Sequence, residues 1–321
     1  MKVCLGFDTS CYTSSVAVAS LDTEAPLFYA QQRKLLQVAK GKRGLQQSEA
    51  VFQHIQNVPE LLETLLAGGK YEIAAVCASV KPRSVAESYM PVFRVGEGSA
   101  RTAAATLHVP FFAATHQQGH LRAALVGTKL SAKDCFLALH LSGGTMETLA
   151  VQDGKAALLG GTLDISAGQL IDRIGVRMGL PFPAGPSMEK LADGVQARSR
   201  VTARVEGCNC HFSGAEAQAL RLLAEGNLSK EEVAAEVFSC IARTVARIVL
   251  SGCEAQRMQS VLLSGGVASS AYLHQEIASR VAKRNRQIEI HVGQKALCGD
   301  NAVGVAILGA EQLNGQNTAT P

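Results

Sequence analysis

Hydrophobic and polar positions alternate with a period of two in short segments of the chain and with a helical period in longer ones. The apolar segment "KVCLGF" and the alternating segment "SVAVAS" flank a turn of small residues, which predicts a strand, a turn and a second strand within residues 2–20. Residues 135–152 repeat the pattern with "CFLALHL", "SGGTME" and "TLAVQ". Two similar hairpins so far apart in the chain predict a duplicated fold with two facing lobes.

Helical periodicity predicts most of the remaining elements. A helix at about 46–67 is predicted because apolar residues recur at helical spacing, namely Phe52, Ile55, Val58, Leu61, Leu62 and Leu65. The strand "IAAVCASV" and the small-residue helix "GSARTAAATLH" follow. In the second half we expect a helix at "SAGQLIDRIGVRMG" that ends at Gly179, helices near 214–225 and 229–250, and the strand "SVLLSGG".

The length of 321 residues predicts two domains. We expect an N-terminal lobe at 1–115 and a C-terminal lobe at 116–299, with a hinge near 113–130 and no low-complexity linker. A closing helix at 300–313 should pack back on the first lobe, and the polar tail 314–321 should be disordered.

Composition places the chain among well-buried globular proteins, with 47% hydrophobic and 18% charged residues. The first residues carry no signal-peptide pattern, and no segment is long and apolar enough to cross a membrane. Nine cysteines scattered through apolar segments indicate reduced, buried thiols. We therefore expect a cytoplasmic protein without a membrane partner.

The net charge of +4 permits a nucleic-acid partner without requiring one. Its distribution is more informative, because basic residues cluster at 31–44, 197–204 and 280–287. Such clusters are more often solvated faces than contacts to a phosphate backbone, so both interpretations stay open.

Three turns of small residues, each after an apolar strand, suggest a nucleotide site. They are "FDTSCYTSS", "HLSGGTME" and "LLSGGVASS". Small residues let backbone N–H groups approach phosphate oxygens, although hairpin turns favour glycine in any case. Two hairpin turns with a third Gly-Gly that enters a helix resemble the actin, hexokinase and Hsp70 superfamily. This resemblance implies an α/β, two-lobed (ASKHA) fold with a duplicated mixed-sheet core and an interlobe nucleotide cleft.

The stretch "ATHQQGH" places His116 and His120 four residues apart. Such a pair on one helix face is more often solvated or packed than ligating. Asp300, which follows "LCG" where the last helix opens, adds a carboxylate. A zincin protease needs a glutamate inside His-Glu-x-x-His as general base, whereas Gln117 and Gln118 stand here, so the pattern disfavours a metalloprotease.

Several segments resemble, in the same order, the tRNA threonylcarbamoyladenosine transferase family (TsaD and relatives, formerly O-sialoglycoprotein endopeptidases). They are "GFDTSC", "HQQGH", "LSGG", the block at 163–192, "HFSGAEAQAL", "LLSGGVAS" and "CGDNAVGVA". The resemblance covers about residues 2–312, and the block at 163–192 is its most specific part. It implies transfer of a threonylcarbamoyl group from threonylcarbamoyl-AMP to N6 of adenosine 37 in tRNA.

The resemblance also implies ligands and site residues. One divalent metal, zinc or iron, would be bound by His116, His120 and Asp300. ATP or threonylcarbamoyl-AMP would be bound by residues at matching positions, with Asp172 and Glu189 open to the alternative of a solvated helix face. These positions are Ser10, Ser142, Gly143, Gly144, Asp164, Gly168, Asp172, Gly185, Glu189, Gly265, Gly266 and Ser270.

The chain departs from the family pattern in places that bear on catalysis. Relatives usually read Glu-Thr-Ser-Cys-Asp-Glu-Thr near the start and the acidic pair is regarded as catalytic, but Tyr12 and Thr13 stand at those two positions here. Neither is a charged base at neutral pH, so the sequence assigns no catalytic residue. Thr145 replaces a usual histidine, Ser270 replaces a usual asparagine, and residues 80–90 replace an Arg-Gly-Pro-Gly loop.

Two hypotheses follow. The first is a divergent tRNA N6-adenosine threonylcarbamoyltransferase, with tRNA and other threonylcarbamoyladenosine-synthesis proteins such as a TsaB-like paralogue as partners. The second is a paralogue that binds nucleotide and metal without transfer and acts as a scaffold in a tRNA-modification complex. The retained metal residues favour the first hypothesis, and the lost acidic pair favours the second.

Overall fold

The computed structural model describes residues 1–10, 12–22, 28–38, 45–83, 88–130 and 134–318. The chain forms two compact units: unit 1 comprises Met1–Val126 and Gly299–Pro321, and unit 2 comprises Gly127–Cys298. The division lies within the expected hinge, but after Val126 and not after residue 115. Both histidines of "HQQGH" therefore belong to unit 1.

Unit 1 is built on a mixed five-stranded sheet. Across the sheet the strands are β3 (Tyr29–Leu35), β2 (Thr13–Ser20), β1 (Lys2–Asp8), β4 (Glu72–Lys81) and β5 (Phe111–Thr115). The hairpin predicted in residues 2–20 is the antiparallel pair of β1 and β2, and β1, β4 and β5 run parallel. The carboxyl ends of these three strands consequently meet at one edge, where sites commonly form in such sheets.

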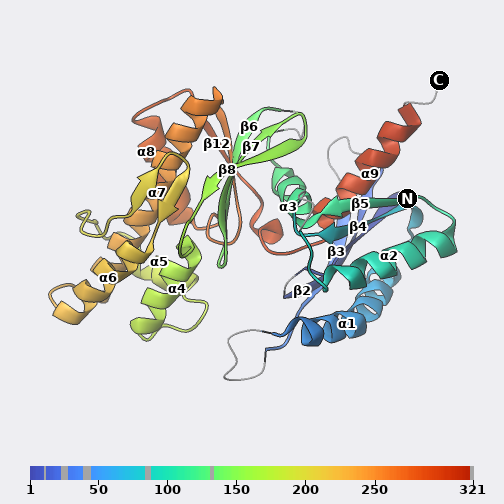
Figure 1. The fold of residues 1–321 in the computed structure, drawn as a ribbon, viewed down its shortest axis with the longest axis horizontal. Helices are drawn as coiled ribbons and strands as arrows, with labels where there is room; N and C mark the ends of the chain where they lie inside the picture. Colours follow the sequence, from blue (N-terminus) through green and yellow to red (C-terminus); the bar gives the residue numbers. More distant parts are fainter. Residues whose placement is uncertain (11, 23–27, 39–44, 84–87, 131–133, 319–321) are drawn as a thin grey trace. The chain divides into compact units, whose positions relative to one another are not determined.

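Helices cover both faces of this sheet (Figure 1). Side chains alternate along β1, so Val3, Leu5 and Phe7 pack towards α1 (Gln47–Ala67) and α2 (Phe93–Leu107), whereas Cys4 faces α9 (Val303–Thr318). Gly6 also faces α9, and a Cβ there would lie 2.7 Å from the Ala306 backbone nitrogen. A side chain at this position would thus push the helix off the sheet.

Two sequence expectations differ from the structure of unit 1. Along α1, Val58, Leu61 and Leu65 are buried as predicted, but Phe52 and Ile55 are 61% and 55% exposed. Periodicity identifies the apolar face of a helix, but it does not show which part of that face other elements cover. The last helix, expected to stop at residue 313 before a disordered tail, continues to Thr318.

Unit 2 repeats the strand order of unit 1. Across its sheet the strands are β8 (Lys155–Gly161), β7 (Met146–Gln152), β6 (Phe136–Leu141), β11 (Ser260–Ser264) and β12 (Glu289–Val292). Again the first hairpin, β6 and β7, is antiparallel, and β6, β11 and β12 run parallel. The predicted duplication and α/β class are confirmed.

The helices of unit 2 match the sequence expectations closely. They are α4 (Ala167–Arg177), α5 (Gly185–Ala192), α6 (Ser213–Glu225), α7 (Lys230–Gln256) and α8 (Ala271–Ala282). A short hairpin, β9 (Arg204–Glu206) with β10 (Asn209–His211), and one 3-10 turn, η1 (Lys295–Leu297), complete the unit. Helix α7 is the central element of the core, since its buried residues run from Val233 to Cys253. Over the described part of the chain, no helix is both long and apolar enough to span a membrane.

Candidate functional site

Helix α3 (His116–Leu125) places the two histidines of "HQQGH" on one face. Thr115, the last residue of β5, caps the helix by accepting from the Gln118 backbone N–H at 3.2 Å, while the Gln118 side chain accepts from the Thr115 N–H at 2.8 Å. Gly119 has a packing role, because a Cβ there would lie 2.8 Å from Cγ2 of Val305 in α9. The residues between the histidines therefore cap and pack the helix.

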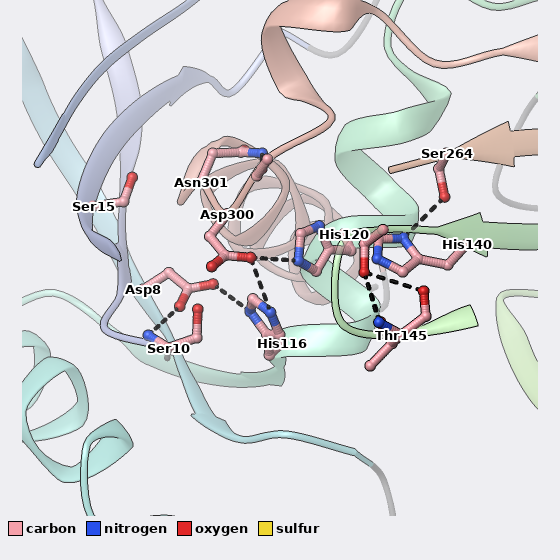
Figure 2. Close-up of polar contacts among 12 residues, drawn as sticks. Asp8, Ser10, Ser15, His116, His120, His140, Thr145, Ser264, Asp300 and Asn301 are labelled. Atoms are coloured by element: carbon pink, nitrogen blue, oxygen red, sulfur yellow. Dashed lines mark hydrogen bonds and ion pairs between the residues drawn. The ribbon is translucent and has the colours of Figure 1, made fainter. Parts of the chain in front are cut away.

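Asp300 completes a cluster of three candidate metal ligands (Figure 2). Its Oδ1 lies 3.1 Å from Nε2 of His120 and 3.6 Å from Nε2 of His116. One ligand atom from each of the three residues lies within 4.8 Å of the other two. Asn301, the next residue, caps α9 by accepting from the Val303 N–H at 3.0 Å, which fixes the chain beside the carboxylate.

Asp8, at the end of β1, orients His116. Its Oδ2 lies 2.8 Å from Nδ1 of His116, and its Oδ1 accepts from the Ser10 N–H at 2.8 Å. A His ring that gives Nδ1–H to a carboxylate keeps Nε2 available as a ligand, which is the usual arrangement behind metal-bound histidines. Sequence reasoning missed Asp8, although it lies in the quoted segment "GFDTSC".

Burial and pairing shift the pKa values of Asp8 and His116 in opposite directions. Burial by itself would raise the pKa of Asp8, but the attraction of His116 and the hydrogen bonds from His116 and Ser10 outweigh it and lower that pKa. For His116, burial would lower the pKa, while Asp8 and then Asp300 raise it. Asp8 is thus held as a carboxylate at neutral pH.

The donor set fits a divalent transition metal. Two imidazole nitrogens and one carboxylate suit zinc or iron, and three protein ligands leave a coordination position open. Ser10 supports a bound group, because its hydroxyl is fully buried and has no hydrogen-bond partner among the described residues. The residues present therefore fit a metal.

Unit 2 contains a separate cavity of about 300 Å³. Most of the residues predicted to bind nucleotide line it: Gly143, Gly168, Asp172, Gly185, Glu189, Gly266 and Ser270. Lys295 lines the same cavity and was not identified from the sequence. A cavity of this size with few polar groups on apolar walls is typical of a small-molecule site.

Hydrogen bonds fix the acidic groups of this cavity. One Asp172 oxygen accepts from the Ala184 N–H at 2.8 Å, and burial raises the pKa of Asp172. Glu189 accepts from the Ser270 hydroxyl at 2.8 Å and the Tyr272 N–H at 3.0 Å, and so also orders the start of α8. Neither is a solvated side chain on a helix face.

The sequence matches the tRNA N6-adenosine threonylcarbamoyltransferase family, TsaD, over residues 31–307. The chain belongs to this family. A threonylcarbamoyltransferase of Neorickettsia sennetsu is 28% identical over 322 residues, covering 96% of this chain and 93% of the relative. One from Methanopyrus kandleri is 29% identical over 316 residues, covering 96% and 86%. A probable bifunctional threonylcarbamoyladenosine biosynthesis protein of Thermoplasma volcanium is 29% identical over 275 residues, 83% of this chain but 49% of that protein.

Solved structures confirm the fold expected of this family. HypF of T. kodakarensis aligns with a TM-score of 0.60 at 15% identity, over 98% of this chain and 48% of HypF. A ROK family glucokinase of Streptomyces griseus, solved with glucose and AMPPNP, aligns with 0.54 at 11% identity, over 96% and 99%. The fold is that of the actin, hexokinase and Hsp70 superfamily.

The positions of the family's acidic pair carry no carboxylate here. Tyr12 is 45% exposed, and its backbone carbonyl accepts from the Leu36 N–H. Thr13 is buried as the first residue of β2. The nearby carboxylate, Asp8, is already engaged by His116.

The remaining predicted nucleotide residues do not line the cavity. Ser10 belongs to unit 1, and Ser142 and Gly144 lie in the β6–β7 turn. The φ of Gly265 is +95°, and a Cβ there would lie 2.3 Å from the Leu141 carbonyl oxygen, so this glycine is required by the backbone. A Cβ on Gly168 would lie 2.5 Å from Cα of Gly143, which shows how closely α4 approaches the turn.

Asp164 has a structural role at the start of α6. Its carboxylate accepts from the N–H groups of Phe212 and Ser213 at 2.8 and 3.1 Å and from the Ser213 hydroxyl at 2.6 Å. Burial opposes ionisation, but these hydrogen bonds and one from Ile165 lower the pKa of Asp164 to about 2. The carboxylate thus stabilises a helix start, a role that its sequence position did not reveal.

Proposed function

We propose that this chain transfers a threonylcarbamoyl group from threonylcarbamoyl-AMP to N6 of adenosine 37 in tRNA. The observation that carries the proposal is the family match over residues 31–307, which includes His116, His120 and Asp300. In the reaction, the N6 nitrogen bonds to the carbonyl carbon and gives up a proton. The bond from that carbon to the phosphate oxygen breaks, and AMP leaves with the electron pair.

Within unit 1, His116, His120 and Asp300 would hold one zinc or iron ion. Polarisation of an acyl oxygen is the chemistry that such an ion supplies when bound. Asp8 would hold His116 in the ligating tautomer, and the buried Ser10 hydroxyl would hydrogen-bond to the bound group.

Within unit 2, the cavity would hold the adenylate. Gly143 and Gly266 offer close backbone approach, since a Cβ at either position meets no atom within 4 Å and the space beside each is open. Lys295 would attract the phosphate, while Glu189 and Ser270 would shape the wall. A mixed anhydride is already activated, so anchoring and orientation supply much of the rate, and we assign no general base.

The cellular setting is part of the proposal. We place the protein in the cytoplasm, with tRNA as acceptor and a TsaB-like paralogue as partner. The exposed Phe52 and Ile55 of α1 offer that partner an apolar contact.

The test is a transfer assay. Purified protein, threonylcarbamoyl-AMP and an unmodified tRNA transcript that reads codons beginning with A are incubated with and without candidate partners, and the nucleosides are then analysed. Threonylcarbamoyladenosine should form with wild-type protein and with His274→Ala, an exposed histidine on α8, but not with His116→Ala. Nucleotide binding without product under every condition would support the scaffold interpretation instead.

A further inference from the structure

Two basic clusters of the sequence, 197–204 and 280–287, meet on one surface of unit 2. Arg243 of α7 donates from Nη1 to the hydroxyls of Ser199 at 2.6 Å and Ser239 at 3.2 Å. Arg280, near the end of α8, donates from Nη2 to the same Ser239 hydroxyl at 3.2 Å. Because α7 packs along α8, these bonds join the two clusters through one buried serine (Figure 1).

Around this junction lie five exposed cationic side chains, which we call the α7–α8 basic surface. They are Arg198, Arg200, Arg247, Lys283 and Arg284. None of them forms a side-chain hydrogen bond or ion pair with any residue that the structure describes. Arg247 lies one helical turn after Arg243, and Lys283 and Arg284 directly follow α8.

Two nearby carboxylates, those of Glu236 and Glu276, are engaged by other groups. Glu236 is 2% exposed, and its oxygens accept from the backbone N–H groups of Arg198 and Arg200 at 2.5 and 2.6 Å. The buried Glu236 thus holds the backbone of the 197–204 loop, while Arg198 and Arg200 themselves remain exposed. Glu276 pairs with Arg280 at 2.9 Å. Some surface cations elsewhere on the chain are paired, as in Lys34–Glu60 and Arg173–Glu216.

Like charges gathered without counter-charges contribute little to folding and favour a partner with repeated negative charge. We propose that the α7–α8 basic surface binds the phosphate backbone of the acceptor tRNA. The proposal rests on the proposed function, in which tRNA is the acceptor. A polyanion suits it better than a single anion, because the five cations are spread over the 197–204 loop, α7 and the residues after α8.

The experiment measures binding of the unmodified tRNA transcript by fluorescence anisotropy across a series of salt concentrations. The test variant is Arg247→Gln, Lys283→Gln, Arg284→Gln. The matched control, Lys155→Gln, Arg177→Gln, Arg221→Gln, removes the same charge from exposed side chains on other elements of unit 2. Neither variant removes a side-chain contact among the described residues, and thermal unfolding checks that both fold.

The test variant should bind tRNA on the order of tenfold more weakly or worse at ~150 mM salt. The slope of log affinity against log salt should flatten by about 2 to 3, because each lost phosphate contact removes roughly 0.9. The control should stay close to wild type. Equal weakening in both variants, an unchanged test variant, or wild-type protein that binds no tRNA would overturn the proposal.

The transfer assay separates this proposal from the proposed function. If tRNA binding is weakened only in the test variant but no threonylcarbamoyladenosine forms, the proposed function is contradicted and the proposed tRNA-binding surface stands. Product formed by wild type and equally by the test variant, with unchanged tRNA binding, would retain the function and overturn the surface.

Discussion

The two units share one strand order, yet the equivalent positions of their sheets carry different chemistry. In unit 1 the strand β1 ends in Asp8, and β5 leads into His116. In unit 2 the equivalent β6 ends before Gly143, and β12 leads to Lys295. Buried carboxylate and imidazole groups at the first edge suit a cation, whereas small residues and an amine at the second suit an anionic ligand. The duplicated fold thus provides two edges, and the side chains placed there decide which ligand each takes.

The largest expected effect tests the assignment of the metal to unit 1. His116→Ala removes a ligand, so metal content after purification should fall from about one ion per chain to nearly none, and transfer should be lost. Nucleotide binding in unit 2, measured by calorimetry with ATP, should remain. His274→Ala should keep both, and retention of metal by His116→Ala would contradict the assignment of unit 1.

Gly265 and Gly266 make a matched pair in the third small-residue turn. Gly265→Ala places a Cβ against the Leu141 carbonyl at a positive φ and should lower the free energy of unfolding by about 2–4 kcal/mol. Gly266→Ala meets no atom within 4 Å and should change it by less than about 1 kcal/mol. Chemical denaturation measures both, and equal losses would contradict the described turn.

Asp8→Asn tests whether the carboxylate that bonds to Nδ1 of His116 orients this ring. An amide cannot stabilise the ring as a carboxylate does, so metal affinity should fall roughly 10- to 100-fold while the fold is retained. Competition with a chelator of known affinity gives the value. Asp22→Asn, elsewhere in unit 1, is the control, and equal affinities for wild type and Asp8→Asn would contradict the orienting role.

Lys295→Gln tests the anionic ligand of unit 2. Loss of one exposed cation should weaken ATP binding about three- to tenfold and leave metal content unchanged. Lys190→Gln, exposed on α5 outside the cavity lining, should have no effect. An unchanged affinity for Lys295→Gln would remove this residue from the site.

The smallest effect concerns Asp164 and acid. Its pKa in the folded chain, about 2, lies below the ordinary value of 3.8, so its contribution is present above pH ~4 and is lost as pH falls towards 2. Asp164→Ala should lower the free energy of unfolding by about 1–2 kcal/mol at pH 7, and the difference should shrink as pH falls from about 4 through 2. Glu225→Ala, at the other end of α6, should show no such dependence.

Local patterns predicted the elements well, whereas roles that depend on distant contacts were harder to read. The hairpins, the helix α4 before Gly179 and the His116–His120 pair follow from spacing over a few residues. Asp8 lies 108 residues before His116, and the contact between them exists only once β1 and β5 join one sheet. Asp164 likewise reaches Ser213 across 49 residues, so its helix-capping role was not visible in the sequence. Phe52 and Ile55 show that periodicity does not report burial.

The most direct test of the account is product formation against metal loading. Metal-free protein, prepared with a chelator, is supplied with threonylcarbamoyl-AMP, unmodified tRNA and candidate partners, and zinc or iron is added from zero to two equivalents. The account predicts that threonylcarbamoyladenosine rises with metal to about one equivalent per chain and then levels off, with none from His116→Ala. Product from the metal-free chain, or undiminished product from His116→Ala, would contradict it.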